Sequence, residues 1–223
     1  MPYLSRRHQL GSSLLYHVFN RVNGHVILFP DKEDYRFFLS LLGRYAKKYK
    51  FRIYHWVLMP THYHLLLEIE EPEKLSSVMA GLARAYAYYY HDRYRSFGHL
   101  WQGRFKSQAI QKEIYILSCG RYIEQGPVEA KIVKDAGEYP YSSASYYVFG
   151  KNGLTAEDPV FKTLGRSLKK RRKKYEKFLA VSDLKEKERF EHLEFPQGSK
   201  EFLKRLVYEN GHFFPRRKGR ARK

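Results

Sequence analysis

The chain has 223 residues, and its 42 Lys and Arg against 23 Asp and Glu give a formal net charge of +19. A hydrophobic content of 43% suffices for a buried core and excludes wholesale disorder. The single cysteine, Cys119, excludes an internal disulfide framework and a multi-cysteine zinc site, and it fits a reducing compartment. The positive charge implies an anionic partner. An aromatic content of 17% favours nucleic acid, because bases stack on aromatic rings.

The sequence predicts a cytoplasmic, nucleoid-associated protein. No apolar run approaches the roughly 18 residues that a membrane-spanning helix needs. His8, Gln9 and His17 interrupt the apolar stretch that a signal peptide would require. A protein bound to the membrane surface would need an amphipathic apolar helix face near the basic tail, and the sequence offers none.

Basic residues concentrate in the C-terminal third, where 151–223 holds 22 Lys and Arg against 10 Asp and Glu. Because the composition changes after Phe149-Gly150, we expect a catalytic-size domain over 1–150 and a basic helical C-terminal extension over 151–223. Within the extension, 166–177 is predicted as a basic helix or linker and 216–223 as a disordered tail. Both segments should supply non-specific phosphate contacts.

Hydrophobic periodicity and turn residues divide the first 150 residues into alternating strands and helices. The expected elements are a strand over 13–20, a helix from Asp31 to about Lys50, strands over 51–59 and 62–70, a helix opened by Pro72, a strand over 104–111, and a helix from Glu113 to about Glu124 that Gly126-Pro127 stops. The order β-α-β-β-α-β predicts an α+β fold, the ferredoxin-like split β-α-β antiparallel sheet with helices on one face.

His62 and His64 flank Tyr63 in the third expected strand. Because side chains alternate across a strand, both histidines share one face, opposite the apolar face that Tyr63 begins. Two imidazoles so placed suit one divalent cation. Two exposed sheet histidines without a ligand would give the same pattern. His55, on the neighbouring strand, is expected to be a core residue rather than a further ligand.

Tyr115 and Tyr122 lie seven residues apart in the helix that follows the fourth strand, so they lie on nearly the same face of the helix. Either phenol could face the histidines and act as a nucleophile on a phosphodiester, because a metal can polarise the phosphate and lower the phenol's pKa. Simple packing is the competing role for each tyrosine.

A basic and aromatic stretch, 98–106, precedes the fourth strand. Arg104 and Lys106 should point to one face of the strand and bind phosphates, with Phe105 on the other. Trp101 or His99 could stack on a base. An ordinary loop with a buried tryptophan is the alternative interpretation.

These segments together resemble the REP-associated tyrosine transposases, single-tyrosine members of the HUH superfamily, over about residues 1–150. The motifs that carry the resemblance are LYHVFNR (15–21), DKEDYRFFLSLL (31–42), WVLMPTHYHLLLE (56–68), GHLWQGRFKS (98–107), RYIEQGPVEAKIV (121–133) and YPYSSASYY (139–147).

The resemblance implies that His62 and His64 are metal ligands for Mg²⁺ or Mn²⁺ and that Tyr122, rather than Tyr115, is the nucleophile. The substrate would be single-stranded DNA with palindromic hairpin repeats, cleaved to a 3′-OH and a 5′-phosphotyrosine and later rejoined by a monomer or homodimer. The expected DNA contacts are Arg21, Trp101, Gln102, Arg104, Lys106 and Arg121.

One position departs from the family. The family has a polar residue, typically Asn, four positions after the tyrosine, and here that residue is Gly126. We expect Gln125 to replace it as the third metal ligand. A catalytically weak relative that only binds hairpins is the alternative function, which Gly126 favours and the set His62, His64 and Tyr122 opposes.

Overall fold

The computed structural model describes residues 10–11, 14–24, 26–151, 153–191, 193 and 195–210. The tail expected over 216–223 lies outside these residues. The principal elements are β1 (Leu15–Arg21), α1 (Lys32–Lys48), β2 (Phe51–Met59), β3 (His62–Ile69), α2 (Leu75–Tyr94), β4 (Lys106–Ile110), α3 (Lys112–Glu129), α4 (Ala144–Phe149), α5 (Leu168–Leu179), α6 (Leu184–Glu191) and α7 (Lys200–Asn210).

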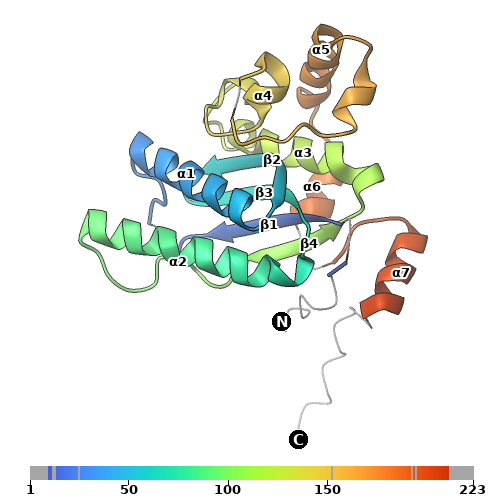
Figure 1. Cartoon of the computed structure of the whole chain (residues 1–223). Coiled ribbons are helices and arrows are strands. Elements are labelled where there is room, and N and C mark those ends of the chain that lie inside the picture. Colours follow the sequence, from blue (N-terminus) through green and yellow to red (C-terminus); the bar gives the residue numbers. More distant parts are fainter. Residues whose placement is uncertain are drawn as a thin grey trace, which may run out of the picture.

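The four strands form one antiparallel sheet in the order β2-β3-β1-β4 (Figure 1). This order confirms the α+β fold and the split β-α-β arrangement. The helices α1 and α2, which connect the strands, lie together on one face of the sheet. Helix α1 begins where expected, because the Asp31 carboxylate accepts hydrogen bonds from the backbone of Glu33 and Asp34 and Asp34 returns one to Asp31.

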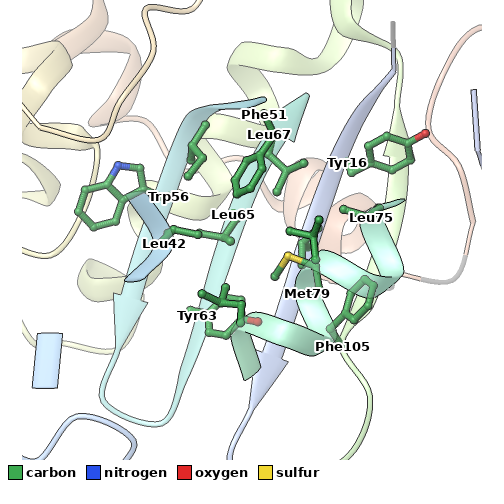
Figure 2. Packing of buried hydrophobic residues seen from close by; sticks show 14 of the residues in the cluster. Tyr16, Leu42, Phe51, Trp56, Tyr63, Leu65, Leu67, Leu75, Met79 and Phe105 are labelled. Carbon is green, nitrogen blue, oxygen red and sulfur yellow. The ribbon is translucent and has the colours of Figure 1, made fainter. Parts of the chain in front are cut away.

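The main core lies between the sheet and these two helices. Alternate residues of β3, namely Tyr63, Leu65 and Leu67, point into it and meet Leu75 and Met79 of α2 (Figure 2). Phe105 joins the same core, as the alternation before the fourth strand predicted. The partner face of the sheet is therefore free to carry polar residues between apolar ones.

Helix α3 covers that second face, packing mainly against β2 and β3 (Figure 1). The prediction that it stops at Gly126-Pro127 is wrong, because α3 continues to Glu129. Pro127 is buried inside the helix. A proline normally pushes the preceding residue out of the helical region through a clash with its Cβ, and Gly126 has no Cβ.

The extension after Gly150 packs into the cores of the first 150 residues. Phe190 of α6 is fully buried against the α3 face, and Phe202 and Leu206 of α7 join the core under α1 and α2. The basic segment does form a helix, α5, whose Tyr175 and Leu179 are buried while most of its lysines are exposed. Among the described residues, no helix has both the length and the apolar character to cross a membrane.

Candidate active site

Three histidines gather on the sheet face that α3 covers. His62 and His64 lie two residues apart on β3, and their rings are 5.4 Å apart and nearly perpendicular. His17 comes from the neighbouring strand β1. Its ring stacks on His64 at 5.1 Å, and Nε2 of His17 lies 2.8 Å from Nδ1 of His64. Strand alternation thus puts His62 and His64 on one face, as predicted, and adds a third imidazole.

Tyr122 brings a phenol to this cluster from α3. Its half-buried ring lies 5.8 Å from that of His17 and 5.9 Å from that of His64, edge-on to both. Tyr115 contacts other groups, with the Arg189 guanidinium 4.5 Å above its ring and Phe190 beside it. The two tyrosines share a helix face but lie two turns apart, and the structure brings Tyr122, not Tyr115, to the histidines.

Burial keeps the imidazoles neutral. It lowers the pKa of His17 to about 3, although Gln108 opposes the shift as a hydrogen-bond partner. Burial, together with the positive charge of Arg21, lowers the pKa of His62 to about 4. The pKa of His64 also lies well below its usual value, through burial and the other two histidines. Neutral imidazoles keep the lone pairs that a metal requires.

Burial also raises the pKa of the Tyr122 phenol far above its usual value, with a smaller contribution from Cys119 and nearby carboxylates. The side chain is therefore a neutral phenol at physiological pH. Any nucleophilic role requires a cation or a proton acceptor beside its oxygen.

The expected third ligand, Gln125, points elsewhere. Its buried amide nitrogen donates to the Leu179 carbonyl of α5, 2.6 Å away. Gly126 faces Met59, the residue paired with His62 across the sheet, and a Cβ placed on Gly126 would lie 3.8 Å from the Met59 sulfur. Within the described residues, no group of three or more His, Cys, Asp or Glu side chains is arranged to hold a metal. The donor set therefore fits a divalent cation bound by two imidazoles, which is a weak site.

Several of the expected DNA contacts border the histidines. Arg21 lies opposite His62 on β1 and is exposed, and its guanidinium donates to the Gln102 side chain. Lys106 lies opposite Phe19, whose ring contacts both His62 and His64. These residues form a basic rim on the same face as the site.

The other expected contacts are placed differently. Trp101 packs on Tyr63 and Tyr86, and its ring nitrogen donates to the Ala83 carbonyl, so it belongs to the core rather than to a base-stacking surface. Arg104 is exposed in the loop before β4. Arg121 is buried, and its guanidinium makes two hydrogen bonds to Glu186 of α6, 2.6 and 2.8 Å long. Arg121 is thus neutralised by the extension.

Sequence reasoning missed His17 as a site residue. The available signal was a histidine inside an otherwise apolar strand, but its face relative to His64 depends on the pairing of β1 with β3. His55 is a core residue, as predicted. Both of its ring nitrogens face carboxylates, Glu124 at 2.9 Å and Asp158 at 3.2 Å.

With this geometry described, comparison with known proteins identifies the class. The family model of the IS200-like transposases matches residues 11–126, just over half of the chain. The chain therefore belongs to the IS200-like transposase family, and a transposase-like, DNA-binding function follows from that membership.

A solved structure of a REP-associated tyrosine transposase bound to a REP hairpin shares the fold, with a TM-score of 0.58 and 19% sequence identity. The match covers 71% of this chain and 90% of the other. It supports the recognition made from the motifs and confirms the fold class. No curated protein matches the chain significantly.

Proposed function

We propose that the protein cleaves and rejoins single-stranded DNA at palindromic hairpin repeats through a covalent bond to Tyr122. The observation that carries this proposal is the convergence of the Tyr122 ring with His64, at 5.9 Å, on the face where His62 also lies. Family membership supports the reaction class, and the hairpin in the related solved structure supports the choice of substrate.

In the proposed reaction, the Tyr122 oxygen attacks a backbone phosphorus and the bond from phosphorus to the 3′ oxygen breaks. The phenol loses its proton, the 3′ oxygen leaves as a 3′-OH, and the 5′ end remains as a phosphotyrosine. Attack by a 3′-OH later reverses the exchange and releases Tyr122. The bond count is unchanged at each step, so rejoining needs no nucleotide cofactor.

His62 and His64 would hold Mg²⁺ or Mn²⁺, the ion proposed for this site. When bound, such an ion polarises the phosphate and stabilises a phenolate. The chain itself supplies the orientation of the phenol against the histidines. Arg21 and Lys106, on the basic rim, would bind the phosphates on either side of the scissile bond, which attracts and aligns the strand.

Acting on chromosomal repeats, the protein would work at the nucleoid, in the cytoplasm. A second function, hairpin binding without cleavage, is favoured by one observation. Gly126 has no side chain and Gln125 is bonded to Leu179, which leaves the histidines without a third protein ligand.

Formation of a covalent adduct separates the two functions. The protein is incubated with a labelled hairpin oligonucleotide and Mn²⁺, and adduct is sought by denaturing electrophoresis and peptide mapping. We expect adduct on Tyr122, loss of adduct in Tyr122→Phe, and retention in the matched control Tyr115→Phe. His62→Ala and His64→Ala should abolish cleavage while hairpin binding persists.

Adduct mapped to Tyr115, or full cleavage by both alanine variants, would exclude the proposed roles. Hairpin binding by the unmutated protein without adduct under either metal would favour the binding-only function.

A further inference from the structure

His17 is linked to both the candidate metal ligand His64 and the polar residue Gln108. On the antiparallel pair β1 and β4, His17 lies directly opposite Gln108. On the other side, His17 lies opposite Leu66, two residues from His64, so the two histidines are diagonal neighbours on one face. His17 has no exposed surface, and its partners are therefore protein groups rather than bulk water.

The orientation of the Gln108 carboxamide is fixed by the extension. Its nitrogen donates to the Phe195 carbonyl at 2.7 Å and to the Arg189 carbonyl at 3.3 Å. A carbonyl oxygen can only accept, so the two contacts identify the nitrogen end of the amide and its two hydrogens. The carboxamide oxygen is then the end that can accept a hydrogen bond from His17.

The ring of His17 follows from this orientation. Its Nε2 faces His64, so the contact with Gln108 falls on Nδ1, which is buried. The Gln108 side chain raises the pKa of His17, which is the effect of a hydrogen-bond acceptor. In a neutral imidazole only one nitrogen carries hydrogen. A proton on Nδ1 therefore leaves Nε2 as an acceptor.

The same rule then applies to His64. Because Nε2 of His17 is an acceptor, the 2.8 Å contact requires a hydrogen on Nδ1 of His64. Nε2 of His64 must then carry the free lone pair. That nitrogen is the one remaining for a metal.

We propose that His17 is a positioning residue that, held by Gln108, fixes His64 in the tautomer with hydrogen on Nδ1 and so presents Nε2 to the metal. This inference rests on the proposed function, because it assumes that His64 is a ligand. Such outer partners orient ligating histidines and raise their basicity, and their loss typically weakens metal binding about 10- to 100-fold. The backbone carbonyls of Arg189 and Phe195 are the far end of the relay.

The tautomers can be read without metal or catalysis. Long-range ¹H–¹⁵N spectra of the metal-free full chain distinguish a protonated ring nitrogen from an unprotonated one. We expect hydrogen on Nδ1 in both His17 and His64, assigned through His17→Gln and His64→Gln. Hydrogen on Nε2 of His64 in the unmutated chain would overturn the relay.

Two isosteric variants test the effect on the metal. His17→Gln places a carboxamide near the position of Nε2 and can still accept from His64, whereas His17→Asn reaches only the position of Nδ1. Mn²⁺ binding, followed by the paramagnetic resonance signal of the free ion, should weaken about 10- to 100-fold in His17→Asn and stay near the parent in His17→Gln. Thermal unfolding and hairpin binding of both variants serve as folding controls.

Equal Mn²⁺ affinities in the two variants would refute the positioning role. If the unmutated chain binds no Mn²⁺, the proposed function fails, and the spectrum still decides whether the relay exists.

Discussion

A buried charge network joins the tyrosine helix to the extension, and it predicts a specific loss of stability at alkaline pH. His55 of β2 has no exposed surface, and its two ring nitrogens face Glu124 of α3 and Asp158 of the extension. The Tyr175 hydroxyl of α5 donates to the other oxygen of Glu124 at 2.8 Å. Gly120 permits the close approach, because a Cβ there would lie 2.6 Å from the His55 ring.

Burial alone would lower the pKa of His55, but the hydrogen bonds and charges of Asp158 and Glu124 outweigh it and raise the pKa to about 9. An unfolded histidine titrates near 6.5. A raised pKa contributes stability that is complete below pH 6.5 and is lost as the pH rises through 9. The full contribution is about 3 kcal/mol, of which about 2 kcal/mol should disappear between pH 6.5 and 8.5.

Urea unfolding at several pH values in this window measures the effect. The free energy of unfolding should fall in the unmutated chain, and the fall should largely vanish in His55→Gln, which cannot be charged. Asp158→Asn removes one of the two carboxylates and should shift the loss to lower pH. Staying below pH 8.5 limits the ionisation of Cys119 in the unfolded chain. A free energy of unfolding that is constant across the window would refute a charged His55.

Two further substitutions test the site. Gly126→Asn should raise Mn²⁺ affinity about tenfold, or 1.4 kcal/mol, relative to Gly126→Ala, because a side chain there meets Met59 at ordinary contact distance beside His62; equal affinities would show that position 126 does not reach the metal. Arg121→Ala should lower the free energy of unfolding by roughly 3 kcal/mol, since it strands Glu186, without changing the salt dependence of hairpin binding. Lys106→Ala should reduce that salt slope by about 1 with little loss of stability, and the reverse pattern would exchange the assigned roles.

Local patterns predicted most of the fold. The period-two pattern gave the strand over 51–59 with the bounds that β2 has, and the aspartate at 31 caps α1 as its chemistry requires. The end of α3 was mistaken because a buried proline preceded by glycine need not break a helix. The packing of the extension was missed because its few buried apolar residues, such as Phe190 and Leu206, are dispersed among charged ones.

The candidate site was predicted where one strand determines the geometry. Alternation placed His62 and His64 on the face away from the main core, and no long-range knowledge was needed. Arg121 and Gln125 were misread as site residues because their partners, Glu186 and Leu179, lie 65 and 54 residues further along the chain. No local pattern reveals such a pairing.

The tyrosine helix is held in place chiefly by the part of the chain that a charge count presents as an appendage. Arg121, Glu124 and Gln125 lie on one face of α3, and each is bonded to the extension, through Glu186, Tyr175 and the Leu179 carbonyl. Tyr122 lies beside that face and is aimed at the histidines. A rotation of α3 that kept these three bonds would require the extension to move as well. The extension therefore sets where the Tyr122 hydroxyl lies relative to His64, independently of the phosphates that its exposed lysines bind.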